Sequence, residues 1–302
     1  MAKNVSRRLK ERNRKIFYYA MMALPLLQFF IFYICVNINS VVLAFKQYSV
    51  TEGEKFVYFD NFSDVINGLF NEPMLTQSFI NSLKVWGATL LIGTTLALVF
   101  SYYIYKKCFG NGLFRVILFL PQIISSIVLI VVFRYFLTEF VPALMKPWDV
   151  KVPDFLDETK TAWTTVLIYA LWTGFGTSTM MYVGAMNNIS DSIVEYAKLD
   201  GFSPLQEFVH ITLPMIYPTL VTFITVGLAG LFTNQMNLYQ FFGGSAEPQL
   251  YTVGYYMYVK IQSAGRADYP FLAAFGLVMT FISAPLTLIV KKLLEKYGPR
   301  VD

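Results

Sequence analysis

Long apolar stretches recur along this chain, and the segments between them hold most of its charged residues. Six windows have the length that a helix needs to cross a hydrocarbon core of roughly 30 Å, and none has a charge near its centre. The windows cover residues 16–45, 79–105, 113–137, 162–186, 215–242 and 271–294. Barrel strands would be shorter and would alternate polar and apolar residues, so the pattern predicts six transmembrane helices.

Composition agrees with a membrane protein, since 56% of the 302 residues are hydrophobic and only 14% are charged. A soluble protein of this length has too much surface to cover with so few charges. The first window is too long for the apolar core of a signal peptide, and no small-residue cleavage pattern follows it, so we interpret it as an uncleaved anchor. Without internal repeats or a linker, the chain is predicted to be one transmembrane domain over 16–294, between short tails at 1–15 and 295–302.

The distribution of charge predicts the orientation, because cytoplasmic flanks of membrane helices are rich in Lys and Arg. The cations lie before the first window, in the turn after the second, and at the end of the last: Lys3, Arg7, Arg8, Lys10, Arg12, Arg14, Lys15, Lys106, Lys107, Lys291, Lys292, Lys296 and Arg300. The segments after windows one, three and five are acidic, and the acids counted there are Glu52, Glu54, Asp60, Asp64, Glu72, Asp149, Asp154, Asp157 and Glu158. Both termini are therefore predicted to be cytoplasmic.

The same distribution limits other functions. The net charge of +5 does not indicate nucleic-acid binding, because the cations lie mostly at membrane edges, where topology explains them. The two cysteines, Cys35 in the first window and Cys108 in an inner turn, cannot meet on this topology, so no disulfide is expected.

Three outer segments connect the windows on the other side. Segments 46–78 and 138–161 mix aromatic and acidic residues, which predicts short helices that lie on the bundle. Segment 243–270 contains Gly243, Gly244 and Pro248 and is expected to be rich in turns.

The inner segment 187–214 departs from the positive-inside trend, with Asp191, Glu195, Asp200 and Glu207 against a single Lys198. This departure indicates that a local function outweighs the topology signal.

Helix-boundary residues in this segment predict two short helices joined at Gly201. Ser192 and Glu195 have the spacing of a capping box, and Gly201 follows where a helix would end at a residue with positive φ. A second capping box starts at Ser203, with proline at the first helical position. Pro214 and Pro218 mark the return to the membrane.

The segment from residue 195 reads EYAKLDGFSPLQEFVHITLP, which resembles the EAA loop of ATP-binding-cassette (ABC) importer permeases. The residues that match are Glu195, Ala197, Gly201, Ile211, Leu213 and Pro214, while Tyr196 replaces the first alanine of the pattern. Three further tracts, YFDNFSDVI, FLPQIISSIVLIVVFRYF and LWTGFGTSTMMYVGAMNNI, are similar to carbohydrate-importer permeases of the maltose and glycerol-phosphate type. The tract FGGSAEPQ resembles the Gly-Gly-Pro segment of that family only loosely.

The resemblance implies an all-α integral membrane protein, a six-helix permease bundle with a cytoplasmic coupling helix, in the bacterial plasma (inner) membrane. It implies three partners: a second homologous permease that completes a heterodimer, a cytoplasmic ATP-binding-cassette ATPase dimer, and an external or periplasmic solute-binding protein. Such a complex imports an oligosaccharide or other carbohydrate by alternating access. Which solute moves, whether the ATPase is dedicated, and whether a homodimer replaces the heterodimer stay open.

In that family the first helix of the loop docks into a cleft of the ATPase. The coupling residues carried over by the resemblance are Glu195, Tyr196, Ala197, Asp200, Gly201, Ile211, Leu213 and Pro214. We expect Glu195 to make a polar contact with the ATPase, Ala197 to allow close approach and Gly201 to form the turn. Alternatively Glu195 is a capping carboxylate, and the two roles can coexist.

Catalytic motifs are missing from the sequence. The chain has no G-x-x-x-x-G-K-[ST] phosphate loop, so ATP and Mg²⁺ are expected on the partner ATPase and no cofactor on this chain, which is not predicted to be an enzyme. His210 is the single histidine and has no other His or Cys nearby, so we interpret it as structural and expect no metal site.

Polar residues inside the predicted spans are candidates for a solute pathway, because positions facing lipid discourage them. The candidates are Gln122, Ser125, Ser126, Trp172, Thr173, Thr177, Asn234, Gln235, Asn237 and Ser283. Amides suit sugar hydroxyls and flat aromatic rings suit sugar faces, which favours a pathway of Gln122, Trp172, Thr173, Asn234, Gln235 and Asn237. The alternative for each is an interhelical hydrogen bond or small-residue packing.

Two other classes of membrane protein fit the sequence less well. A secondary transporter or channel subunit for a small polar solute should show inverted repeats or an intramembrane charge, and neither is evident. A membrane-embedded enzyme would need clustered catalytic groups at the interface, and none is seen.

Overall fold

The structure, a computed structural model, describes residues 2–49, 53–150, 152–156 and 159–299. Some charged residues used to predict orientation lie outside this description: Glu52, Asp157, Glu158 and Arg300, with the side chains of Lys3, Arg7, Arg8 and Lys10. One compact unit comprises residues 1–66 and 264–278, and a second comprises 67–263 and 279–302.

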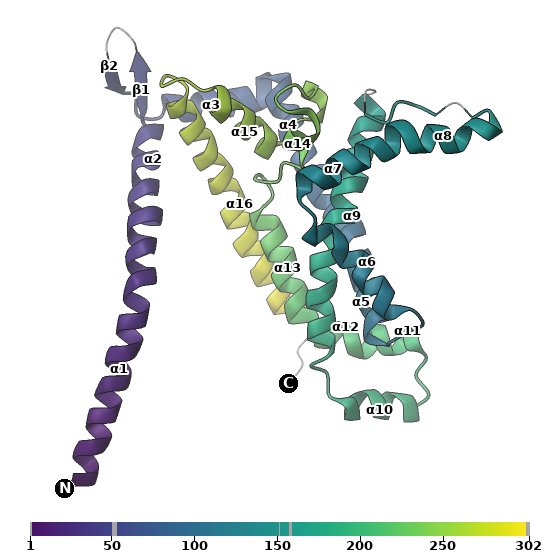
Figure 1. Cartoon of the computed structure of the whole chain (residues 1–302). Helices are drawn as coiled ribbons and strands as arrows, with labels where there is room; N and C mark the ends of the chain where they lie inside the picture. The colour runs from purple at the N-terminus through teal and green to yellow at the C-terminus, as the bar shows by residue number, and fades with distance from the viewer. Residues whose placement is uncertain (1, 50–52, 151, 157–158, 300–302) are drawn as a thin grey trace. The chain divides into compact units, whose positions relative to one another are not determined.

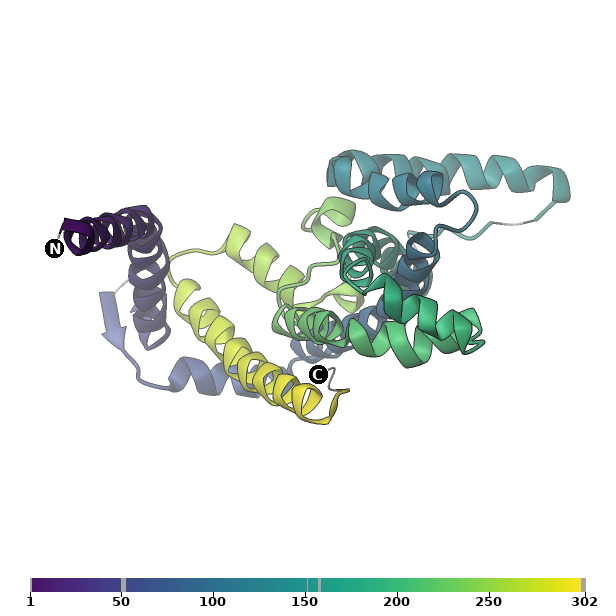
Figure 2. The ribbon, with the colours of Figure 1, turned by 90° about the horizontal axis from the view of Figure 1, so that it is seen from below.

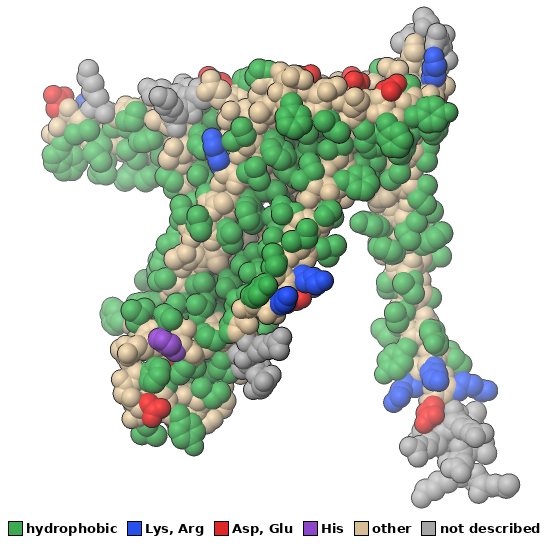
Figure 3. Space-filling model, turned by 180° about the vertical axis from the view of Figure 1, so that it is seen from behind, with side chains coloured by type: hydrophobic (Ala, Val, Ile, Leu, Met, Phe, Trp, Pro, Cys, Tyr) green, Lys and Arg blue, Asp and Glu red, His purple; other side chains and the backbone are tan. Residues whose placement is uncertain are grey.

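The first predicted span is a single long helix, which confirms that prediction. Helix α1 (Ala2–Gln28) passes through a π-helical stretch (Phe29–Cys35) into α2 (Val36–Ala44) without a break (Figure 1). None of the most apolar part of this helix is buried within the described chain. Figure 3 shows hydrophobic side chains along its length and Lys and Arg side chains near its N-terminal end, the distribution of a helix surrounded by lipid.

A small hairpin follows, where only helices were expected. Strands β1 (Lys46–Ser49) and β2 (Gly53–Phe56) pair antiparallel, with Lys46 opposite Phe56 and Ser49 opposite Gly53. Gly53 has φ +74°, a conformation that suits a chain reversal and not a helix. Asn61, in α3 (Asp60–Asn71), is buried and donates to the carbonyls of Ala44 (2.8 Å) and Lys46 (2.7 Å). This amide joins the hairpin to the end of the first span and to α3, which is the helix expected here.

The second unit is built on two long helices. Helix α4 (Pro73–Ala88), a π-helical stretch (Thr89–Gly93) and α5 (Thr94–Tyr105) form one helix of 33 residues, and α9 (Thr159–Met186) packs along α5. These helices confirm the second and fourth predicted spans. Ser101 donates across the contact to the carbonyl of Thr179 (3.0 Å). The buried core between them holds Ala97, Ile104, Leu118, Phe175, Tyr182, Val183, Met186, Ile189 and Ile216.

The third predicted span is wrong as a single helix. Helix α6 (Asn111–Ile123) ends at Ile124 and Ser125, whose ψ angles of 139° and 132° are extended, and α7 starts a new helix at Ser126. The interruption follows Pro121, which lacks a backbone N–H and crowds the preceding turn. Helix α7 (Ser126–Tyr135) continues through a π-helical stretch (Phe136–Phe140), α8 (Val141–Met145) and a 3₁₀ turn (Lys146–Trp148) as one helix (Figures 1 and 2).

The fifth predicted span is also divided. Helix α12 (Leu213–Met215) and α13 (Tyr217–Ala229) meet at a bend of 68°, and α13 ends far short of the predicted residue 242. Residues 230–237 turn, with φ of +51° at Met236 and +57° at Asn237, before the short helix α14 (Leu238–Phe242). Positive φ at two successive residues is incompatible with a helix, so an apolar window here contains a non-helical segment.

The rest of the chain is mostly helical. Segment 243–270, expected to be rich in turns, contains a 3₁₀ turn (Pro248–Leu250) but also the helix α15 (Val253–Ser263). Helix α16 (Tyr269–Tyr297) confirms the sixth predicted span. In the described residues five helices are long and apolar enough to cross a membrane, or six if the bent pair counts as one span.

Candidate functional site

The inner segment folds as two short helices around Gly201, as its sequence predicts. Helix α10 (Asp191–Leu199) ends before Gly201, which has φ +75°, and α11 (Pro204–Glu207) begins after Ser203. The predicted box at Ser203 is present, since its N–H donates to Gln206 Oε1 (2.8 Å) and its hydroxyl accepts from the Gln206 N–H (3.4 Å).

The other predicted capping box is wrong. Ser190, not Ser192, occupies the N-cap of α10, and no side chain caps that end. The two serine hydroxyls contact each other instead, at 2.7 Å. The backbone at Ser190 is already extended (ψ 132°), so α10 begins earlier than the serine and glutamate spacing indicated. Glu195 is therefore not engaged as a capping carboxylate.

Helix α10 has an outer and an inner face. Glu195 and Asp200 are exposed, whereas Ala197 is only 3% exposed and lies in the interior of this chain. The close approach expected at Ala197 is thus present within this chain. Ile211, Leu213 and Pro214 are half-buried in the stretch that leads to α13, so they hold the segment in place rather than form its surface.

Segment 187–214 lies outside the predicted spans, yet it exposes large apolar side chains. Tyr196 is 70% exposed, Leu199 82% and Leu205 72%, and we call these three residues the loop patch. Figure 1 shows α10 below the lower end of α9 and running crosswise to it. Exposed apolar side chains outside the membrane are typical of a docking surface for another protein.

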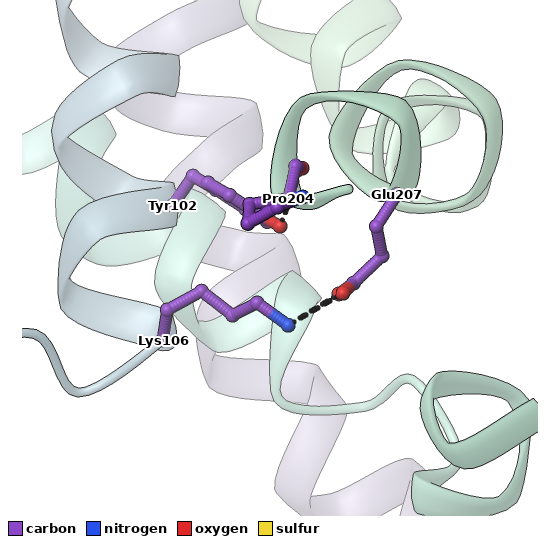
Figure 4. A network of polar contacts seen from close by, with 4 residues as sticks. All are labelled: Tyr102, Lys106, Pro204 and Glu207. Atoms are coloured by element: carbon purple, nitrogen blue, oxygen red, sulfur yellow. Dashed lines mark hydrogen bonds and ion pairs between the residues drawn. The ribbon is translucent and has the colours of Figure 1, made fainter. Parts of the chain in front are cut away.

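Next to the loop patch, α11 is joined to the end of α5 by a partly buried ion pair. Both carboxylate oxygens of Glu207, a residue 3% exposed, lie 2.6 Å from Lys106 Nζ (Figure 4). The Tyr102 hydroxyl donates to the carbonyl of Pro204 (2.8 Å). Sequence analysis identified Glu207 as an acid of segment 187–214 and Lys106 as a cation of the inner turn, but no spacing rule links positions 101 residues apart.

A second feature is a cavity of about 640 Å³ between α6, α7, α9 and the turn 230–237. Five of the six predicted pathway residues line it: Gln122, Thr173, Asn234, Gln235 and Asn237. Further polar residues at the wall are Thr89, Ser126, Thr177, Thr233 and Gln240. Of these, sequence reasoning missed Thr89, Thr233 and Gln240 as pathway candidates, because only the fold brings them to this wall. Among the described residues that line the cavity, none is charged.

Trp172 is the predicted pathway residue that does not line the cavity. Its ring lies in an aromatic cluster, with centroids 6.1 Å from Tyr169 and 6.4 Å from Phe133. Thr173, the next residue along α9, points to the cavity in its place, because successive helical residues are about 100° apart. Trp172 therefore supports the wall and does not form it.

Some polar groups that line the cavity already form hydrogen bonds within the chain. The Gln122 amide donates to the Thr173 carbonyl and so links α6 to α9, which is the interhelical role considered above. The Thr173 hydroxyl donates to the Tyr169 carbonyl (2.9 Å), and Asn234 Oδ1 accepts from the Met236 N–H (2.9 Å). These residues therefore make internal hydrogen bonds and line the cavity at the same time.

Buried polar groups of α4 hold the polar turn from behind. Asn81, 1% exposed, donates to the carbonyls of Gln249 (2.8 Å) and Tyr251 (2.9 Å), and Ser82 accepts from the Val253 N–H (3.0 Å). The hydroxyl of Thr252 then donates to the Asn234 carbonyl (2.8 Å). These contacts fix the non-helical segment that carries the amides.

Tyr255 fastens the next turn. Its hydroxyl donates to the Gly243 carbonyl (2.7 Å) and accepts from the Ala246 N–H (3.3 Å). Burial raises the pKa of Tyr255, so the phenol keeps the proton that it donates.

Helices of membrane length, an uncharged polar cavity between them and an exposed apolar loop define a membrane transport subunit. Residues 89–302 match the family described as binding-protein-dependent transport system inner membrane component. The chain belongs to this family, and it is an inner-membrane, multi-pass permease subunit of an ABC importer. The resemblance stated from the loop is confirmed, and a secondary transporter or channel is not favoured.

Individual relatives are distant but extend over most of the chain. The probable ABC transporter permease protein YesP of Bacillus subtilis is 26% identical over 262 residues, which cover 84% of this chain and 82% of YesP. The arabinooligosaccharides transport system permease protein AraP of the same organism is 24% identical over 93% of this chain and 89% of AraP. The lactose transport system permease protein LacF of Rhizobium radiobacter is 28% identical over 77% and 78%.

Solved structures show the same fold. A crystal structure of a bacterial ABC transporter that imports the acidic polysaccharide alginate aligns with a TM-score of 0.79 at 21% identity, over 96% of this chain and 99% of the other. A crystal structure of bacterial alginate ABC transporter in complex with alginate pentasaccharide-bound periplasmic protein aligns with a TM-score of 0.75, over 94% of each chain. The likeness confirms the all-α permease bundle.

Proposed function

We propose that this subunit forms half of the pathway by which an oligosaccharide or other carbohydrate enters the cell. The observation that carries the proposal is the uncharged cavity, whose amides and hydroxyls suit a neutral solute rich in hydroxyl groups. Relatives named for arabinooligosaccharide and lactose transport support the same substrate class. An anionic polymer such as alginate would require cations at this wall.

The loop patch supplies the contact with an ATPase subunit. In this proposal Tyr196 and Leu199 enter an apolar cleft of the ATPase while the neighbouring carboxylate of Glu195 meets a polar group there. ATP and Mg²⁺ are bound by the ATPase dimer, and this chain binds no cofactor. A second permease completes the pathway, an external or periplasmic binding protein delivers the solute, and both termini of this chain are cytoplasmic.

The test is ATP hydrolysis and sugar import by the co-purified complex in lipid vesicles, with and without the binding protein. Radiolabelled arabinooligosaccharides and lactose are the probes. We expect Leu199→Ser and Glu195→Ala each to lower binding-protein-stimulated hydrolysis about tenfold, as loss of an interface anchor does. Gly201→Asp should act similarly because a side chain is strained at φ +75°.

The matched control is Ser192→Ala, an exposed position on the first turn of the same helix. It should keep the wild-type rate. A wild-type chain that moves either sugar without any ATPase would contradict the importer proposal. Stimulated hydrolysis that is the same in wild type and Leu199→Ser would remove the loop patch from the coupling surface.

A further inference from the structure

The Lys106–Glu207 ion pair is not explained by docking to an ATPase. Glu207 is buried, so it is not part of the surface that α10 and α11 present. A carboxylate is taken out of water at a large cost unless it is paired, and here both of its oxygens meet the same ammonium group at 2.6 Å. A pair of this kind fixes the relative position of the two elements that carry it.

Two further contacts strengthen the same junction. The Tyr102 ring packs on Phe208 with centroids 4.9 Å apart, and its hydroxyl holds the Pro204 carbonyl. The Lys106 ammonium lies 5.6 Å from the centroid of the Tyr102 ring and 5.9 Å from that of Tyr105. Charge, hydrogen bond and ring contacts thus join the last turn of α5 to the start of the helix after Gly201 (Figure 4).

Both joined elements lead to the cavity. The helix of α4 and α5 places Thr89 at the cavity wall. The helix that starts at Pro204 continues through a bend into α13, and the turn after α13 carries Asn234, Gln235 and Asn237 to the same wall. Two stretches of chain thus run from this junction to the cavity wall, and the ion pair joins them at the junction.

We propose that Lys106 and Glu207 are positioning residues, which make α5 and α11 move together when an ATPase displaces α10. This inference rests on the proposed function, because it assigns a task within that coupling. Without the ion pair, α11 shifts against α5. A displacement of α10 then reaches the cavity through α13 but not through the helix of α4 and α5. ATP is then hydrolysed with less solute imported.

The experiment compares Lys106→Met, Glu207→Met and the double variant, each in the full complex with its ATPase and binding protein in lipid vesicles. The measured quantities are sugar imported per ATP hydrolysed, with arabinooligosaccharides and lactose as probes, and the thermal stability of the complex. We expect the single variants to lower the import-to-hydrolysis ratio at least about fivefold, the lower range of coupling between distant sites. Lys107→Met, an exposed cation one residue away, is the matched control and should keep the ratio.

The double variant separates positioning from simple packing. Replacing both charges by apolar side chains of similar volume is expected to restore thermal stability, because no charge is left buried and unpaired. The import-to-hydrolysis ratio should stay low in this double variant. It should recover in the exchanged pair Lys106→Glu with Glu207→Lys. If the single variants do not assemble, the comparison of these two double variants is the test. A double variant with the wild-type ratio would overturn the inference. If the wild-type complex itself shows neither stimulated hydrolysis nor import, the proposed function fails instead.

Discussion

Glu195 and Glu207 are acids of one short segment, yet the structure gives them opposite surroundings. Glu195 is exposed beside Tyr196, whereas Glu207 is buried against Lys106. An exposed carboxylate keeps its hydration and is available to a partner, while a buried one is committed to the cation that compensates it. The distinction separates a carboxylate that is open to a partner, as proposed for Glu195, from one that holds the loop in place.

Removing the hydroxyl of Thr177 tests whether the cavity wall contacts the sugar. Thr177→Val keeps the shape of the side chain and removes the hydroxyl from the cavity wall. Losing one hydrogen bond to a sugar, worth about 1 kcal/mol, should lower import at low sugar concentration by about fivefold. Uptake into vesicles at a series of sugar concentrations measures the effect.

Thr95→Val is the matched control, because Thr95 is exposed on α5 and does not line the cavity. Its hydroxyl donates to the Leu91 carbonyl of its own helix (2.5 Å). Equal loss of import in both variants would show that the Thr177 hydroxyl has no part in the pathway.

Of the residues predicted from their type to form a pathway, the amides line the cavity and the one aromatic residue does not. Gln122, Asn234 and Asn237 were identified because amides are rare inside apolar windows, and the structure brings all three to one wall. Trp172 was chosen on its chemistry, but which way a helix residue points depends on the neighbours of the helix. The partner of Glu207 could not be predicted at all, since it depends on how α5 and α11 meet.

Helix contacts can be tested at Gly176, where α9 meets α6. A Cβ at this position would lie 2.4 Å from the Leu118 carbonyl oxygen, so Gly176→Ala must push the two helices apart. We expect a loss of about 1–3 kcal/mol of stability, the usual cost of overpacking, and a lower melting temperature of the purified complex. Gly184→Ala is the control in the same helix, because nothing lies within 4 Å of a Cβ there. A Gly176→Ala complex as stable as wild type would contradict the close contact of α6 and α9.

An apolar window predicted a helix correctly where no non-helical residue interrupts it. The windows at 79–105 and 271–294 correspond to continuous helices. The windows at 113–137 and 215–242 are also apolar, although the second carries several amides, and they contain interruptions at Ile124–Ser125 and at 230–237. Hydropathy measures preference for lipid and carries no information on backbone continuity, and Pro121 was the available signal for the first break. The interruptions lie at the cavity, where non-helical backbone is tolerated in a membrane protein.

At the scale of the whole molecule, the predicted orientation can be tested with the chain's own cysteines. In a Cys35→Ser background, Cys108 lies in the turn between α5 and α6 and is half-buried. We expect a membrane-impermeant maleimide to label it only after the cells are permeabilised. A cysteine at Tyr58, 71% exposed after the hairpin, should be labelled in intact cells. The opposite labelling would reverse the topology and place the loop patch outside, away from any cytoplasmic ATPase.

The length of the helix formed by α4 and α5 has a further consequence for the lipid around the protein. Its 33 residues extend about 50 Å at 1.5 Å per residue, well beyond a hydrocarbon layer of about 30 Å. Where the apolar part of the helix exceeds the layer, the helix tilts or the bilayer thickens locally, and its polar ends lie beyond the layer. Because Lys106 follows the last turn of this helix, the tilt sets the angle at which α5 meets α11. Acyl-chain length is thus a variable to which transport by the complex is expected to respond, with no change in any residue.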